Sequence, residues 1–248
     1  MLGVDDPELT SPEEVGRGVL LPAHVYPMFD VVLRANDGLG IDEHRRRIAE
    51  LWADASRVAA TNPHAWIRRA FTADEVGTPS ADNRMIAFPY TKLMCSNNNV
   101  EQAAAVVLCS AERAADLGVP RDRWVFLHSG TDAHDHWWVS ERDRLDSSPA
   151  IRLAGRRALE LAGTAADDVA HVDLYSCFPS AVQVATRELG LGRDRQLTVT
   201  GGMSFAGGPW NNYVTHAIAT MASVLREDPG SKGLVTANGG YLTKHAFG

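Results

Sequence analysis

Tyr175-Ser-Cys-Phe178 is the first of three short polar loops that decide the fold; the others are Gly201-Gly-Met-Ser-Phe-Ala-Gly-Gly-Pro209 and Ala237-Asn-Gly-Gly240. Strand-like or helix-like runs flank each loop. The runs 170–175 and 232–236 are short, apolar and bounded by turn residues, which predicts buried strands. Because catalytic groups commonly lie on loops at the ends of such strands, the three loops together predict one functional site.

Helical and strand-like segments alternate from residue 98 onward, which predicts α/β layering. Ser147-Ser-Pro149 predicts the start of a helix, because serine caps helices and proline is tolerated in the first turn. The expected segments are an apolar, alanine-rich run at 100–107, a strand at 124–128, a helix at 148–162 closed by Gly163, a strand at 170–175, a helix at 179–189 and a helix at 212–225.

Residues 1–90 are rich in Pro, Arg and Trp, and only one segment in them has a strong helical pattern. That segment, 42–60, is amphipathic, and its apolar stripe consists of Ile48, Leu51, Trp52, Ala55 and Val58. The rest is expected to form loops and short helices, because Pro, Asn and Gly favour turns. We therefore expect this region to connect elements and to have no core of its own.

Composition excludes several classes of protein. The chain has 248 residues, of which 45% are hydrophobic and 22% charged, as in globular proteins with a sizeable core. A formal net charge of −7 argues against binding to duplex nucleic acid. The three cysteines show no CxxC spacing, which favours a reducing, cytoplasmic compartment. No apolar run is long enough for a membrane span, and the start has no leader pattern.

The segment Tyr241-Leu-Thr-Lys-His-Ala-Phe-Gly248 follows a glycine-rich turn, where a pairing strand is expected, and stops without polar dilution. This pattern suggests a truncated sequence. A truncated fold would expose strand edges and apolar surface, so the chain is expected to be poorly soluble alone, and to form a homo-oligomer or bind a partner subunit.

The order of the three loops resembles the C-terminal half of the thiolase superfamily, in particular sterol-carrier-protein-type thiolases and thiolase-like acetyl-CoA acetyltransferases. Phe88-Pro-Tyr-Thr-Lys-Leu-Met-Cys95 resembles part of the loop domain of these proteins. The resemblance implies an incomplete layered α/β/α thiolase-like fold. Residues 1–97 would be the loop domain, 98–147 the end of the N-terminal half with a crossing segment, and 148–248 most of the C-terminal half.

The resemblance also implies a chemistry, which is Claisen condensation or thiolysis of acyl-CoA. The family uses a nucleophilic Cys from its N-terminal half, an Asn or His in the first loop, a His in a Gly-His-Pro loop and a Cys in a Cys-x-Gly loop. Here Tyr175, Gly208 and Ala237 occupy the last three positions, and the nucleophile has no counterpart. Neither Gly208 nor Ala237 can transfer a proton, whereas the phenol of Tyr175 can still donate a hydrogen bond.

Acid or base work would then fall to Tyr175, Tyr241 or His245, the last two returning from the third loop. The glycines allow close approach of backbone N–H groups to an oxyanion, although ordinary turns would explain them equally well. The helix after Pro209 would direct its positive N-terminal end to the same pocket. The expected substrate-binding residues are Ser176, Cys177, Phe178, Gly201, Gly202, Gly207, Gly208, Asn238, Gly239 and Gly240.

Other reactive side chains have simpler explanations. Cys95 is expected to be a packed thiol, and Cys177 either faces the pocket or has a structural role. The segment Asp132-Ala-His134-Asp135-His136 contains metal-ligand types, but we expect a polar crossing segment with Trp137 and Trp138 packed beneath it.

Two classes of function remain open. The first is a thiolase-like acyl-CoA acyltransferase, or a related retro-aldolase-like carbon–carbon lyase. The second is a non-catalytic protein that binds acyl-CoA or a protein partner. In both, coenzyme A is a substrate or ligand, and no other cofactor or metal is expected.

Overall fold

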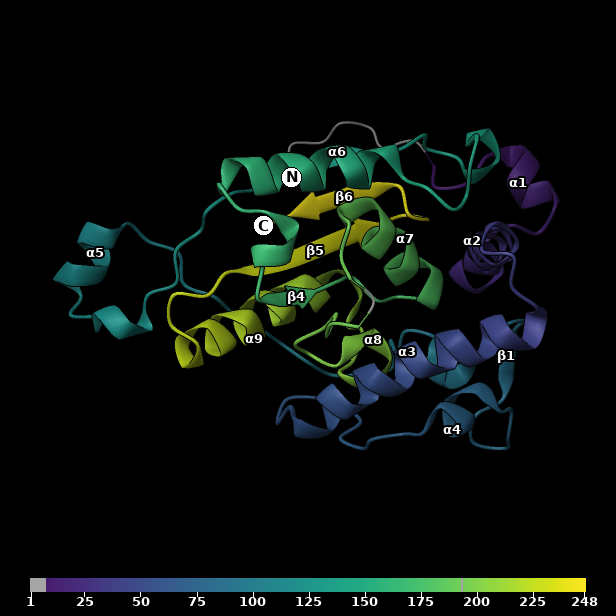
Figure 1. Ribbon diagram of the computed structural model, residues 1–248, viewed down its shortest axis with the longest axis horizontal. Coiled ribbons are helices and arrows are strands. Elements are labelled where there is room, and N and C mark those ends of the chain that lie inside the picture. The colour runs from purple at the N-terminus through teal and green to yellow at the C-terminus, as the bar shows by residue number, and fades with distance from the viewer. Residues whose placement is uncertain (1–7, 193) are drawn as a thin grey trace.

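The computed structural model describes residues 8–192 and 194–248, in which helices cover both faces of a central sheet (Figure 1). The helices are α1 (Pro12–Gly16), α2 (Pro22–Asn36), α3 (Ile41–Thr61), α4 (Ala73–Gly77), α5 (Ala111–Asp116), α6 (Pro149–Leu161), α7 (Pro179–Leu189), α8 (Gly202–Phe205) and α9 (Tyr213–Glu227). The strands are β1 (Met85–Ala87), β2 (Tyr90–Thr91), β3 (Thr131–His134), β4 (His171–Asp173), β5 (Gly233–Gly239) and β6 (Lys244–Phe247).

The central sheet has the strand order β3-β6-β5-β4. β4 and β5 are parallel, whereas β6 runs antiparallel to both of its neighbours, β5 and β3. Helix α6 lies on one face and α9 on the other (Figure 1). Small residues permit close packing: a side chain at Gly155 of α6 would overlap Leu189 of α7, and one at Gly233 of β5 would overlap Met221 of α9. The structure therefore confirms the α/β class.

Helices α6 and α7 form where the local sequence predicts them. The Ser148 hydroxyl accepts a hydrogen bond from the N–H of Ile151 at 3.1 Å, and Pro149 occupies the first turn of α6. Gly163 follows α6 with φ +56, and Gly190 ends α7 with φ +67. Each end is thus defined by residues within one turn of it.

The strand expected at 124–128 is wrong, since these residues form no regular element, and neither does the apolar run 100–107. The nearby strand is β3, a few residues later. The third loop also differs, because Ala237, Asn238 and Gly239 belong to β5. The segment that follows, where a pairing strand is expected, contains strand β6, which pairs with β5. The helix expected from residue 212 begins at Tyr213, after a one-turn helix at 210–212.

Helix α3 confirms the predicted amphipathic helix, and Ile48 and Trp52 of its stripe are buried. The N-terminal region also contains α2, a helix of 15 residues whose side chains join the same apolar cluster as those of the central sheet. Among the described residues, no helix combines the length and the apolar character that a membrane crossing requires.

A buried polar network joins α2, α3 and α7. Asp30 accepts hydrogen bonds at 2.8 Å from the His44 ring and from the Gln183 amide, and a third from the Tyr90 hydroxyl. Tyr90 also contacts the hydroxyl of Ser180 at 2.9 Å. Because buried polar groups are costly when unpaired, this network specifies how the N-terminal helices lie on α7.

Glu188 ties the start of α6 to α7, and this contact predicts a pH dependence. Burial raises the pKa of Glu188, but hydrogen bonds from Arg152, Ser147 and Ser148 outweigh burial and hold the pKa below its ordinary 4.5. The stabilisation is therefore complete above pH 4.5 and is lost as pH falls through the folded-state pKa. In urea unfolding, the free energy of unfolding of the wild type should fall between pH 6 and pH 3. Glu188→Gln should make this fall smaller by about 1 kcal/mol.

The exposed Glu160→Gln variant is the control for Glu188→Gln and should follow the wild-type curve. Identical pH curves for wild type and Glu188→Gln would contradict the role given to Glu188.

Candidate active site

The first loop follows β4 and leads into α7. The Phe178 ring stacks on the Tyr26 ring, with centroids 4.6 Å apart. Cys177 is buried, and its sulfur lies 3.9 Å from the side-chain nitrogen of Asn238. Tyr175 is held by its backbone N–H, which donates to the Thr236 hydroxyl at 2.9 Å. The first and third loops therefore meet, as the sequence predicts.

Tyr26 of α2 joins these loops, and the sequence analysis missed it. Its hydroxyl accepts hydrogen bonds from the Asn238 amide at 3.1 Å and from the N–H of Leu242 at 3.2 Å. It also contacts the Cys177 thiol. No local pattern around Tyr26 indicates this role, because the contacts come from segments far away in the sequence.

The chemical state of the site follows from its burial. Burial raises the pKa of the Cys177 thiol to about 12, and hydrogen bonds from Tyr26 and Asn238 oppose the shift without cancelling it. Burial also raises the pKa of Cys95 to about 12, and it raises the pKa of the Tyr26 and Tyr175 phenols. The site therefore presents neutral thiols and phenols at pH 7, which donate hydrogen bonds and are poor nucleophiles.

The second loop is organised by a buried carboxylate, Asp173 at the end of β4. Its Oδ2 accepts from the Thr198 hydroxyl at 2.8 Å, the Val199 N–H at 2.9 Å and both the N–H and the hydroxyl of Thr200. Its Oδ1 accepts from the Tyr213 hydroxyl at 2.8 Å. Burial raises the pKa of Asp173 in spite of these donors. Strand β4, the second loop and α9 are thereby fixed to one another.

The second loop also lies directly against α3. A Cβ atom at Gly201, which has φ +101, would lie 2.5 Å from the Cα and the nitrogen of Ala59. Gly202 has φ +76, and the N–H of Met203 donates to the Ser176 hydroxyl at 3.0 Å. Gly201 and Gly202 thus allow the second loop to lie close to α3. The short helix α8 begins at Gly202, where an open turn is expected.

Residues 95–98, which precede all three loops in sequence, contact both the first and the second loop. The N–H of Ser96 donates to the carbonyl of Cys177 at 3.1 Å, and the N–H of Asn97 donates to the carbonyl of Met203 at 3.1 Å. The Ser96 hydroxyl occupies the space beside Gly208, only 2.1 Å from where a Cβ atom would lie. The Ser96 side chain thus fills the space that a side chain at position 208 would need. The polar run 96–99 after Cys95 is the signal that could have indicated this contact.

The other predicted site residues are engaged elsewhere. The Tyr241 hydroxyl donates to the carbonyl of Leu20 at 2.7 Å, and His245 lies buried in β6 with its Nε2 atom 3.4 Å from Asp135 Oδ2. Gly207 lies against the Gln102 amide, whereas Gly239 and Gly240 shape the β5–β6 connection beside Lys244 and Thr243. Tyr175, Cys177 and Asn238 are therefore the predicted residues that the structure brings together.

The polar segment before α6 has a structural use. Asp135 accepts hydrogen bonds from the Ser148 hydroxyl and the N–H of Ala150, which completes the cap of α6. Trp137 and Trp138 both donate their ring N–H to the carbonyl of Glu8. Asp135 thus serves the helix cap and the contact with His245.

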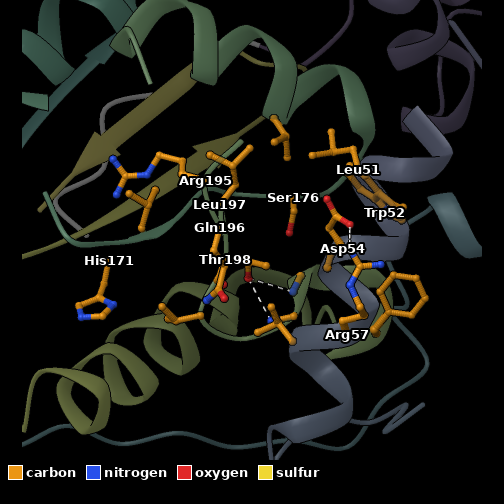
Figure 2. A pocket seen from close by; sticks show the side chains of 18 of the residues that line it. Leu51, Trp52, Asp54, Arg57, His171, Ser176, Arg195, Gln196, Leu197 and Thr198 are labelled. Carbon is orange, nitrogen blue, oxygen red and sulfur yellow. Dashed lines mark hydrogen bonds and ion pairs between the residues drawn. The ribbon is translucent and has the colours of Figure 1, made fainter. Parts of the chain in front are cut away.

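A cleft of about 740 Å³ lies behind the first two loops (Figure 2). Helix α3 forms one wall with Trp52, Ala55 and Val58, and residues 194–199 form the opposite wall. Ser176 and Gly201 belong both to this cleft and to the loops. Its volume is in the range of small-molecule sites, and it adjoins the cluster formed by Tyr26, Tyr175, Cys177 and Asn238.

Removal of the Tyr26 hydroxyl tests the cluster. Tyr26→Phe should lower the free energy of unfolding by about 1–3 kcal/mol, because the Asn238 amide and the Leu242 N–H lose their acceptor. Thermal or urea unfolding measures this loss. Tyr241→Phe is the matched control, and its effect should be smaller because Leu20 is half exposed and water can replace the lost hydrogen bond to its carbonyl. Equal losses in both variants would contradict a special role for Tyr26.

The chain is similar in sequence and fold to known proteins. No family model matches the chain. An acetyl-CoA acetyltransferase of Methanocaldococcus jannaschii is 28% identical over 105 residues, which are 42% of this chain and 26% of that protein. The crystal structure of a monomeric SCP2-thiolase-like protein type 1 from Mycobacterium smegmatis is 35% identical with a TM-score of 0.87, and the match covers 97% of this chain and 53% of that one.

The chain thus spans about half the length of the Mycobacterium smegmatis structure. A third protein, the Ltp2-ChsH2(DUF35) aldolase, is 20% identical with a TM-score of 0.73, and the match covers 99% of this chain and 69% of that one. This last likeness shows the shared fold.

Proposed function

We propose that this chain, which belongs to the thiolase-like superfamily, binds an acyl-CoA thioester at the three-loop site and is part of an acyl-CoA acyltransferase. The carrying observation is the cluster of neutral donors, in which Tyr175, Cys177 and Asn238 meet beside the buried Tyr26 hydroxyl. Residues 1–97 would act as the loop domain, 98–147 as the end of the first half and the crossing segment, and 148–248 as most of the second half.

In this proposal the donors stabilise negative charge on the thioester oxygen. The Tyr175 ring packs edge-on against Tyr213, and the Asn238 amide is held by its hydrogen bond to the Tyr26 hydroxyl. Donors that are positioned before the substrate arrives are how an oxyanion site lowers a barrier. The high pKa of Cys177 argues against its being the nucleophile. The acyl-accepting cysteine would therefore be supplied by polypeptide outside residues 1–248.

Proton transfer at carbon is the step that separates the candidate reactions. Gly208 and Ala237 offer no acid or base, and the contacts of Tyr241 and His245 lie with Leu20 and Asp135. These facts favour Tyr175 as the group that exchanges a proton with the substrate. A neutral phenol also suits a retro-aldol cleavage: it gives its proton to the enolate carbon formed by the cleavage, and the proton released from the substrate hydroxyl group restores the phenol. A retro-aldolase-like lyase with a partner subunit is therefore the second candidate.

Calorimetric titration of the chain with coenzyme A and acetyl-CoA tests the proposal. Acetyl-CoA should bind, and Tyr175→Phe should weaken its binding by roughly 5- to 10-fold, the effect of one lost hydrogen bond. Ser223→Ala, an exposed hydroxyl on α9, is the control and should leave binding unchanged. Absence of binding at millimolar ligand would refute the proposal.

Activity assays separate the candidates when the same variants are joined to the polypeptide that supplies the acyl-accepting cysteine. Thiolysis of acetoacetyl-CoA that Tyr175→Phe abolishes supports the acyltransferase, and cleavage of a β-hydroxyacyl-CoA supports the lyase. Binding without either reaction would favour a non-catalytic acyl-CoA-binding protein. A selective loss in His245→Ala or Tyr241→Phe would move the acid or base role to that residue.

A further inference from the structure

The hydroxyl group of Tyr175 has no hydrogen-bond partner within residues 8–192 and 194–248, and its oxygen atom is not sealed from solvent. The backbone of Tyr175 is fixed, because its N–H donates to the Thr236 hydroxyl at 2.9 Å. The partly buried ring, however, can rotate about its side-chain bonds unless neighbouring atoms restrain it. Packing against the ring must therefore set the direction in which the phenol points.

The ring of Tyr213, the first residue of α9, packs against the ring of Tyr175. The ring centroids are 5.6 Å apart and the ring planes lie at 88°, which is an edge-to-face arrangement. Such pairs are attractive, because the positive edge of one ring meets the negative face of the other. Among the aromatic rings that the structure describes, no other forms a ring contact with Tyr175. The orientation of Tyr175 thus depends on Tyr213.

Tyr213 is itself anchored at its hydroxyl group. The side chain is buried, and its hydroxyl donates to Asp173 Oδ1 at 2.8 Å and lies 2.8 Å from the Thr200 hydroxyl. Burial raises the pKa of the Tyr213 phenol well above its ordinary value. The phenol therefore stays protonated at neutral pH and keeps donating to the carboxylate. The Tyr213 ring is thus fixed at its tip, whereas the Tyr175 ring is not.

The partners of the Tyr213 hydroxyl lie on both sides of Tyr175 in the chain. Asp173 precedes Tyr175 by two residues, and the hydroxyl of Ser176, the next residue, also contacts the Tyr213 phenol. Tyr213 therefore holds the first loop before and after Tyr175 while its ring packs against Tyr175. Because its own hydroxyl is buried and engaged, Tyr213 offers no group to a ligand. Its influence on a ligand would act through Tyr175.

We propose that Tyr213 is a positioning residue, which holds the Tyr175 ring in one rotamer before any ligand binds. A donor that is already oriented loses little conformational entropy on binding, so the ligand binds more tightly. The effect on the ligand rests on the proposed acyl-CoA site, in which Tyr175 donates to the thioester oxygen. A Tyr213 that only fills the core would stabilise the fold without affecting the Tyr175 rotamer.

Nuclear magnetic resonance of the 248-residue chain with labelled tyrosine tests the rotamer directly. Three-bond couplings of the Tyr175 side chain, assigned by the signals that Tyr175→Phe removes, should show one rotamer in the ligand-free wild type. Tyr213→Phe keeps the ring and should keep this rotamer. Tyr213→Met, whose flexible apolar side chain adapts to the vacated space, should show averaging over several rotamers. Averaging in the wild type would overturn the proposal, and this measurement needs neither a ligand nor a folded variant.

Calorimetric titration with acetyl-CoA tests the consequence for binding. Tyr213→Met should weaken binding by roughly 5- to 10-fold, as Tyr175→Phe does. Added to Tyr175→Phe, it should change the affinity by less than about 2-fold, because no hydroxyl is left to position. Tyr213→Phe should bind within about 2-fold of the wild type, since it retains the ring. Additive losses in the double variant, or unchanged affinity in Tyr213→Met, would overturn the proposal.

Leu33→Ala is the control for a general loss of stability. It creates a cavity at a fully buried residue of α2, so it should destabilise the chain and leave both the Tyr175 rotamer and the affinity unchanged. A matching loss of affinity in Leu33→Ala would show that stability alone governs binding, against the proposal. If the wild type shows one Tyr175 rotamer but does not bind acetyl-CoA, the proposed function fails and the positioning role stands.

Discussion

Gly201→Ala should destabilise the chain by roughly 3 kcal/mol or more. A residue with a side chain is strained at φ +101, at a cost of about 1–2 kcal/mol. The new methyl group would also lie 2.4–2.5 Å from atoms of Ala59, so that α3 and the second loop must separate, at a further cost of about 1–3 kcal/mol. Urea unfolding monitored by circular dichroism measures the loss.

Gly163→Ala separates the two contributions to this loss. Gly163 also has a positive φ, +56, but a Cβ atom there would have no neighbour within 4 Å. Its substitution should therefore cost only the backbone strain, about 1–2 kcal/mol. A Gly201→Ala variant that is no less stable than Gly163→Ala would show that α3 does not lie against the second loop.

Asp173→Ala should have an effect of similar size, roughly 3 kcal/mol, because it leaves several buried donors without an acceptor. The Val199 and Thr200 N–H groups and the hydroxyl of Tyr213 all direct hydrogen bonds to this carboxylate. The second loop should become mobile as well, so acetyl-CoA binding should be lost together with stability. Chemical denaturation and calorimetry on the same preparation measure both effects.

The exposed Asp168→Ala variant is the control for Asp173→Ala, and it should change neither stability nor binding. If Asp173→Ala retained full stability, the carboxylate would not organise the loop. If it lost stability but bound acetyl-CoA normally at low temperature, the second loop would not belong to the ligand site.

The elements that sequence analysis located are those with local signals. Helix α6 has a serine cap and a proline at its start, and α7 ends at a glycine with positive φ. Helix α2 was not specified, because Pro22 and Pro27 read as breakers. It forms nonetheless, since Pro22 occupies the first turn, and burial of Phe29 and Leu33 outweighs the hydrogen bond that Pro27 cannot make.

The expected strand at 124–128 failed for a nonlocal reason. Composition indicates that a segment can pair, whereas a strand exists only when a partner is present. The site likewise contains some residues that local sequence indicates and others that only distant packing brings in. Tyr175, Cys177 and Asn238 follow from their loops, but Tyr26 and Ser96 reach the site from elements far away in sequence. The packing of distant segments, which decides such contacts, leaves no periodic signal.

The position of β6 between β3 and β5 has a consequence for biosynthesis. Residues 244–247 hydrogen-bond to both neighbours, and β3 joins the sheet through β6. On the ribosome, β3, β4 and β5 all emerge earlier, so the sheet stays divided until residue 247 has left the exit tunnel. Long-range pairing of this kind is slow and leaves nascent strands open to aggregation. Chaperone dependence during translation should therefore depend on how quickly residues 244–247 are made.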